Sequence, residues 1–100
     1  MHFMEKVQLE LDEKGFGHFY IMEGDERLGE MELSISDSTM TVYHTEVSPK
    51  AEGKGYAKML LKEMVEHARK NDLKVILLCP FVHLQFKRHA DDYADIWKKD

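Results

Sequence analysis

The sequence predicts an α+β fold built on one mixed sheet. We expect an antiparallel meander of four strands, an amphipathic helix, a fifth strand parallel to the fourth, and a short C-terminal helix. Three segments in the first half have apolar residues at every second position, and a fourth is rich in β-branched and aromatic residues; short turn-forming stretches separate the four. A long stretch with helical periodicity follows, and then one short, continuous apolar run. With 100 residues in all, we expect a single domain over residues 1–100.

The four meander strands are predicted at residues 5–11, 17–24, 27–35 and 39–47. In the first three, every second residue is apolar, as in strands with one buried face. The fourth is rich in β-branched and aromatic residues, which suit a pleated surface. Neighbouring strands should pair antiparallel, because a parallel pair would need a connection of a dozen or more residues.

The helix is predicted to follow a glycine-containing turn, the two together spanning residues 52–70. Its apolar residues recur every three or four positions, as on one face of a helix. They are Ala57, Leu60, Leu61, Met64, Val65 and Ala68.

The chain after the helix completes a β-α-β unit over residues 39–78. Residues 74–78 form the continuous apolar run that is typical of a strand covered on both faces. Pro80 suits the first turn of a final helix around residues 81–89. In β-α-β units, ligands bind at the carboxyl ends of the strands, near the helix N-terminus.

The composition indicates a soluble protein in a reducing, cytoplasmic setting. A net charge of −5, from 19 acidic and 14 basic residues, lacks the basic footprint of a nucleic-acid-binding protein. The single cysteine, Cys79, excludes an internal disulfide, and no apolar run resembles a signal peptide or a membrane span. We therefore expect neither a nucleic-acid nor a membrane partner, whereas the sequence leaves the oligomeric state open.

The turn before the helix is the first candidate binding site. Gly53 and Gly55 flank Lys54 there, and a turn rich in glycine at a helix N-terminus suits a phosphate-bearing ligand. The alternative is a flexible loop that simply enters a helix. The GxxxxGK[ST] signature is missing, so a nucleoside triphosphate loop of that type is not predicted.

Three segments, in this order and spacing, resemble the short single-domain branch of the GNAT superfamily of acetyl-CoA-dependent N-acetyltransferases: HTEV at 44–47, EGKGYAKMLL at 52–61 and LKVILLCPFV at 73–82. The superfamily's acetyl-CoA motif is Gln or Arg, two variable residues, Gly, one variable residue, then Gly or Ala. Gly55 and Ala57 occupy its small positions, whereas Glu52 departs from the usual Gln or Arg. The resemblance covers roughly the C-terminal two-thirds of the chain.

The resemblance implies that the fourth and fifth strands splay apart and that the pantetheine arm of acetyl-CoA lies between them, bonded to backbone near Glu46 and Val47. A helix dipole and oriented amides hold an anion without a net-basic protein. Acetyl-CoA is thus the implied cosubstrate, and a primary amine of a small molecule or a protein lysine the acceptor. The implied pyrophosphate-binding residues are Gly53, Lys54, Gly55, Tyr56, Ala57 and Lys58.

Cys79 and His44 are the candidate catalytic residues. Cys79 ends the fifth strand, where the thioester should arrive, and it is either a buried hydrophobic residue, a nucleophile or an acid that protonates the departing thiolate. His44 shares its predicted strand face with Met40 and Val42, as a core histidine would. Alternatively, its imidazole deprotonates an incoming ammonium or activates Cys79.

The remaining histidines show no HExxH or paired CxxC spacing, so we expect no metal site. The basic residues at 87–89 form a solvated helix end or meet the 3′-phosphate of CoA. Tyr93, Ile96 and Trp97 should pin the C-terminal tail to the core. The leading hypothesis is acetyl transfer to a primary amine; a non-catalytic CoA-binding or sensing module and a small interaction domain are the alternatives.

Overall fold

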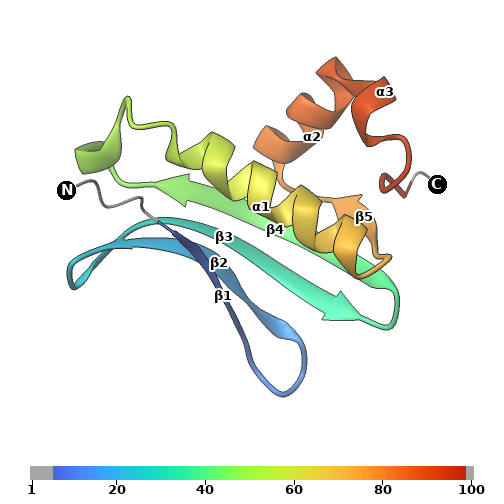
Figure 1. The fold of residues 1–100 in the computed structure, drawn as a ribbon, viewed down its shortest axis with the longest axis horizontal. Helices are drawn as coiled ribbons and strands as arrows, with labels where there is room; N and C mark the ends of the chain where they lie inside the picture. The colour runs from blue at the N-terminus through green and yellow to red at the C-terminus, as the bar shows by residue number, and fades with distance from the viewer. Residues whose placement is uncertain (1–5, 99–100) are drawn as a thin grey trace.

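The computed structural model describes residues 6–98 and confirms the mixed sheet, with strand order β1-β2-β3-β4-β5 (Figure 1). The first four strands pair antiparallel, and β5 is parallel to β4. Each predicted strand is present with small shifts at its ends, although residue 5 lies outside the described residues. The strands are β1 (Val7–Leu11), β2 (Phe16–Glu23), β3 (Glu26–Ser36), β4 (Thr39–Val47) and β5 (Lys74–Leu77).

The helices lie together above one face of the sheet (Figure 1). The main helix begins at the predicted place, directly after Gly55, and ends at Lys70. Two short elements were not predicted, a 3₁₀ turn before the main helix and a last turn near the C-terminus. The elements are η1 (Pro49–Ala51), α1 (Tyr56–Lys70), α2 (Pro80–Arg88) and α3 (Ala90–Tyr93).

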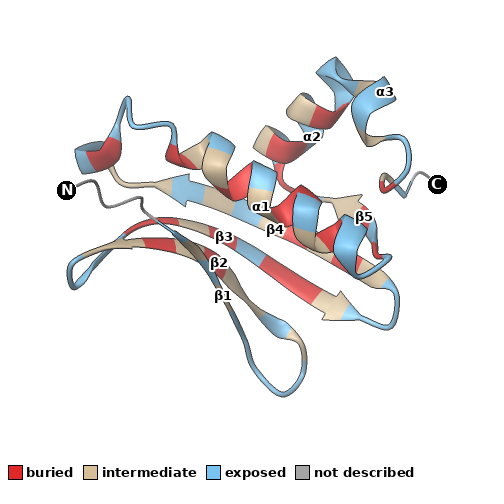
Figure 2. Ribbon diagram, viewed as in Figure 1, coloured by how far each residue is buried: buried red, intermediate tan, exposed pale blue. Residues whose placement is uncertain are grey.

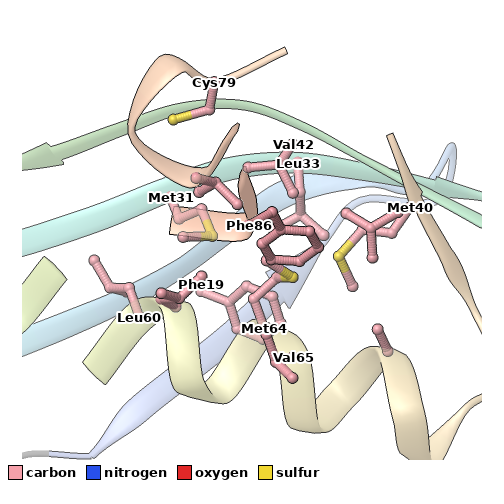
Figure 3. Packing of buried hydrophobic residues seen from close by; sticks show 14 of the residues in the cluster. Phe19, Met31, Leu33, Met40, Val42, Leu60, Met64, Val65, Cys79 and Phe86 are labelled. Carbon is pink, nitrogen blue, oxygen red and sulfur yellow. The ribbon is translucent and has the colours of Figure 1, made fainter. Parts of the chain in front are cut away.

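The core fills the space between this face of the sheet and the helices, as Figure 2 shows. Strand side chains that alternate toward the helices meet the buried stripe of α1, and α2 adds Phe86. Figure 3 shows Phe86 among Val42, Leu33 and Met64, all fully buried. The strands contribute Phe19, Ile21, Met31, Leu33, Met40 and Val42, and α1 contributes Leu60, Leu61, Met64, Val65 and Ala68.

The C-terminal tail is fixed to the core, as predicted. Tyr93 stacks on Phe86 with ring centroids 4.3 Å apart, and Ile96 is buried. Val75 donates to the carbonyl of Ile96, and Trp97 forms a parallel bridge with Val75. The tail therefore extends the sheet beside β5 instead of crossing to its other face.

The opposite face of the sheet, called here the open face, carries no helix of residues 6–98 (Figures 1 and 2). The prediction that residues 74–78 are covered on both faces is therefore wrong. Ile76 is only half-buried, and Leu78 is 61% exposed. The apolar run reflects one buried face and a terminal apolar residue, because α2 and the tail pack on the same side as α1.

Candidate functional site

A gap opens between β4 and β5 at Val42. The two strands pair only from Thr39 and Lys74 to Val42 and Leu77. The N–H groups of Leu78 and Cys79 then both donate to the carbonyl oxygen of Val42, at 2.9 and 3.0 Å. Beyond this point β4 continues to Val47, and no strand within residues 6–98 pairs with it on that side.

The hydrogen bonds between β4 and β3 show which backbone groups of β4 face the gap. Ser48 N–H donates to the carbonyl of Leu28 at 2.8 Å, on the β3 side. Because only alternate residues of an antiparallel strand bond to the same neighbour, Glu46 also directs its backbone toward β3. Thr45 and Val47 direct theirs into the gap. The resemblance placed the cofactor near Glu46 and Val47, and of the two it is Val47 whose backbone faces the gap.

A β-bulge in β4 sets the direction of the side chains near the gap. Glu32 pairs with His44 and Leu33 with Val42, so Tyr43 is the extra residue. A bulge interrupts the alternation of faces. Tyr43 and His44 therefore both lie on the open face, while Thr45 points to the helix side. No motif in the sequence marks Thr45 as part of a site.

Cys79 lies on the helix side of the gap and is 1% exposed. Its Sγ is 3.4 Å from the hydroxyl of Thr45. His44 lies on the other face, with its side chain 62% exposed and its Nε2 4.0 Å from a carboxylate oxygen of Glu46. The predicted placement of His44 beside Met40 and Val42 is wrong because of the bulge. The structure accordingly does not bring His44 and Cys79 together for activation of the thiol.

The turn before α1 is held in a conformation that favours glycine. Gly53 and Gly55 have φ values of +84° and +78°, a region that L-residues rarely adopt. A Cβ at either position would meet nothing within 4 Å, so backbone conformation rather than space requires glycine. Gly55 is the N-cap of α1 and supplies no side-chain cap. The first N–H groups of the helix therefore remain directed out of its end.

A cavity of about 420 Å³, called here the β4–α1 groove, connects this turn with the end of β4. It brings together most of the predicted cofactor-binding residues, and Phe81 of α2 closes one side. Phe81 escaped prediction because only the fold places α2 beside α1. The lining residues are Val47, Ala51, Glu52, Gly53, Gly55, Tyr56, Ala57, Lys58 and Phe81.

Lys54 does not line this groove. Its Nζ donates to a carboxylate oxygen of Glu23 at 2.7 Å, and the hydroxyl of Tyr56 donates to the same oxygen. The hydrogen bond from Lys54, followed by that from Tyr56, lowers the pKa of Glu23 below its ordinary value. Lys54 thus ties the turn to the end of β2, which fixes the position of the groove wall.

A second cavity of about 460 Å³, the α1–α2 groove, lies between the outer sides of these helices. Lys58 lines both grooves, so they are neighbours. Lys58 and Lys62 are one helical turn apart and therefore lie on the same side of α1. This spacing is visible in the sequence and could have predicted Lys62 as part of a basic site. The other lining residues are Leu61, Val65, Glu66, Arg69, Gln85, His89 and Tyr93.

Within residues 6–98, no three His, Cys, Asp or Glu side chains are grouped so that they could hold a metal ion. None of the helices in the described part of the chain is long and apolar enough to cross a membrane.

Comparisons with known proteins point to one family. A family model described as GCN5-related N-acetyl-transferase matches residues 18–96. A Staphylococcus aureus protein solved by NMR, provisionally described as a GCN5-like N-acetyltransferase, is 32% identical. The match covers 97% of this chain and 93% of that one, with a TM-score of 0.68. No curated protein matches the chain by sequence.

Two more distant structures share the fold. The ribosomal-protein-S18-alanine N-acetyltransferase of Escherichia coli is 15% identical with a TM-score of 0.58, and the match covers 66% of this chain but 43% of that enzyme. The ribosomal-protein-alanine N-acetyltransferase of Brucella melitensis biovar Abortus 2308 is 18% identical with a TM-score of 0.59, covering 88% and 65%. At these identities the likeness concerns the fold alone.

Proposed function

The chain belongs to the GCN5-related N-acetyltransferase family, and from this premise we propose that it binds acetyl-CoA and transfers the acetyl group to a primary amine. One observation carries the proposal. The glycine turn, the uncapped start of α1 and the end of β4 all line a single groove of about 420 Å³ beside the gap between β4 and β5. An elongated ligand with a phosphate in its middle fits this arrangement.

The two ends of the groove suit two parts of the cofactor. The pyrophosphate is assigned to the N–H groups from Gly55 to Lys58, where the helix dipole favours negative charge. The pantetheine arm is assigned to the gap, where its amides can bond to the backbone of Thr45 and Val47 as an added strand would. The adenosine 3′-phosphate is assigned to the α1–α2 groove, which Lys58 and Lys62 make basic.

The two faces of β4 divide the chemistry of transfer. On the open face, His44 takes a proton from the incoming ammonium, with a carboxylate oxygen of Glu46 4.0 Å from its Nε2. The amine nitrogen then attacks the thioester carbon, and backbone N–H groups of β4 in the gap stabilise the developing oxyanion. On the helix side, the C–S bond breaks and the thiol of Cys79 donates its proton to the departing CoA thiolate. The nitrogen loses its second proton to water, and Cys79 regains a proton from water before the next turnover.

Direct transfer is assigned in preference to an acetyl-cysteine intermediate. Cys79 is buried, and the contact of its sulfur is the neutral hydroxyl of Thr45. A nucleophilic cysteine is activated by an adjacent base or cation, whereas this sulfur contacts a hydroxyl and His44 lies on the other face of the sheet. Mass spectrometry of the intact protein after incubation with acetyl-CoA tests this choice. A +acetyl adduct that disappears in Cys79→Ala would establish the covalent route instead.

Titration calorimetry with acetyl-CoA tests the binding site through a matched pair of variants. Gly55→Asp and Gly55→Asn have almost the same size, and Asn and Asp are the L-residues that best tolerate positive φ. Only the Asp variant places a negative charge at the pyrophosphate site. We expect Gly55→Asp to weaken binding about tenfold or more relative to Gly55→Asn.

Calorimetry and an assay of CoA thiol release with a panel of amines together separate the hypotheses. An absence of heat with the wild-type protein, or equal affinity of the two Gly55 variants, would contradict the proposed site. Binding that is accompanied by no release of CoA thiol across a panel of amines would support a CoA-binding or sensing module. Release of thiol with an amine establishes transfer.

Glu52 supplies a refinement of the same test. Its carboxylate lines the β4–α1 groove at the position where the family motif has Gln or Arg, so it repels the proposed pyrophosphate. We expect Glu52→Gln to bind acetyl-CoA several-fold more tightly, by about 1 kcal/mol or less for an exposed charge. Unchanged affinity would mean that the phosphates lie away from Glu52.

A further inference from the structure

The open face around His44 is acidic and not neutralised from within. Glu30 and Glu46 lie directly opposite each other on β3 and β4, and Glu32 lies opposite His44. Like charges directly opposed across a sheet are destabilising, so stability does not account for this pair. Among the described residues, neither Glu32 nor Glu46 forms an ion pair with a lysine or arginine.

Arg27, a cation on the neighbouring part of β3, is already engaged. Arg27 lies over the ring of Tyr20, 4.1 Å from its centroid, and its guanidinium is 3.9 Å from Glu10. Two histidines make the further contacts within the described residues: His18 Nε2 is 3.5 Å from Glu30, and His44 Nε2 is 4.0 Å from Glu46. An added cation would therefore find carboxylates that no lysine or arginine of the described residues neutralises, on a face that no helix covers.

Two shallow hollows lie on this face, one lined by Glu32, which pairs with His44, and the other by Glu46. The first has about 290 Å³ and is lined by Glu10, Glu32 and the apolar ring of Phe16, which is 52% exposed. The second has about 300 Å³ and is lined by Glu30, Glu46 and Arg27, whose guanidinium lies over the ring of Tyr20. Each combines carboxylates with apolar atoms, which suits the charged head and aliphatic stem of lysine or arginine.

We infer that the open face docks an extended, basic protein segment and that a lysine of this segment is the acetyl acceptor, an inference that rests on the proposed acetyl transfer. Glu30 and Glu32 are two residues apart on β3, a spacing of about 7 Å, which matches cationic side chains at alternate positions of an extended chain. A cation over Glu30 then places a lysine two residues away beside Glu32, directly opposite His44. A small metabolite would occupy one hollow and leave the other unused.

The negative charge of the open face also argues against other binding partners. A second copy of this chain would present the same acidic face, and like charges juxtaposed across an interface are costly. Nucleic acid would be repelled for the same reason. A free polyamine shares the cationic chemistry but lacks a backbone that fixes its amines at strand spacing, so it serves as the comparison in the test.

The test measures CoA thiol release with three acceptors. They are a peptide with one central lysine and an arginine two residues away on each side, the same peptide with glutamines in place of the arginines, and spermine. We expect kcat/KM for the arginine-flanked peptide to exceed that for the glutamine-flanked one by about tenfold or more. The advantage should lie in KM and shrink as salt is raised. Equal turnover of the two peptides, or better turnover of spermine than of either, would overturn the inference.

The matched variants separate docking from overall charge. Glu30→Gln/Glu32→Gln removes two charges from the open face, whereas Glu13→Gln/Asp25→Asn removes two from exposed turns elsewhere. We expect only the first variant to lose the advantage of the arginine-flanked peptide, with affinity for acetyl-CoA unchanged in both. Equal effects of the two variants would refute a local docking surface.

A binding measurement keeps this inference distinguishable from acetyl transfer itself. Fluorescence anisotropy of a labelled arginine-flanked peptide reports docking without turnover. Salt-sensitive binding that is lost in Glu30→Gln/Glu32→Gln supports the docking surface even if no amine is acetylated. Absence of binding by the wild-type protein overturns it even if small amines are acetylated.

Discussion

The two faces of the same sheet obey opposite physical demands. On the helix-covered face, strand residues such as Met31, Leu33 and Val42 are fully buried against α1 and α2. On the open face, the same strands present Glu32, His44 and other polar groups, with like charges directly opposed. The covered face determines whether the chain folds, and the open face is free to hold groups that cost stability. Substitutions should therefore separate stability from activity by face.

The largest loss of stability is expected from Phe86→Ala. Phe86 is fully buried between the sheet and α1, and it stacks on Tyr93. Removing the ring leaves a cavity, with an expected cost of about 3–5 kcal/mol in the free energy of unfolding. Leu84→Ala on the same helix is the control, because Leu84 is 43% exposed. Similar losses in urea unfolding for the two variants would show that α2 does not pack as described.

An intermediate effect is expected where the open face has a buried polar contact. Ser34 is 9% exposed, and its hydroxyl is 2.7 Å from that of Tyr43. Tyr43→Phe removes this hydrogen bond and leaves the Ser34 hydroxyl without it, at a cost of about 0.5–1.5 kcal/mol. In a double-mutant cycle, Ser34→Ala should make the Tyr43→Phe substitution less costly. Strict additivity would mean that the bond contributes nothing.

A smaller effect of opposite sign is expected from Glu46→Lys. The substitution replaces a repulsive cross-strand pair with an attractive one opposite Glu30, which should stabilise the protein by about 0.2–1 kcal/mol. The gain should diminish as salt is raised. A gain of stability coupled to a loss of acetyl transfer would show that the open face is arranged for function. A destabilised variant would contradict this view of the face.

Periodicity predicted the strands and α1 because their apolar spacing comes directly from burial on one side. Periodicity gave the wrong faces after Tyr43. A bulge inserts one residue without any mark in the sequence, and every later side chain of β4 then lies on the opposite face from the one predicted. His44 was therefore assigned to the wrong face, while the turn at Gly53 and Gly55 was correctly located. Thr45 and Phe81 join the site only through three-dimensional packing, and no local pattern marks them.

The smallest expected effect concerns the pH dependence of stability, and it again distinguishes the two faces. His67 on α1 meets the ring of Phe19 edge-on, with centroids 5.7 Å apart. Partial burial lowers its pKa below the ordinary 6.5, with Glu63 opposing the shift and Lys70 adding to it. The unfolded chain then binds the proton more readily. Stability should be complete above pH 6.5 and decline as the pH falls below it toward the lower folded-state pKa.

Urea unfolding at several pH values between 5 and 8 measures this decline, about the range in which histidine titrates. His67→Gln should flatten the curve below neutrality, because the proton-binding difference at this site disappears. The matched control is His44→Gln on the open face, where the side chain is 62% exposed. If both variants flatten the curve equally, burial on the covered face is not its cause, since only His67 packs against the core.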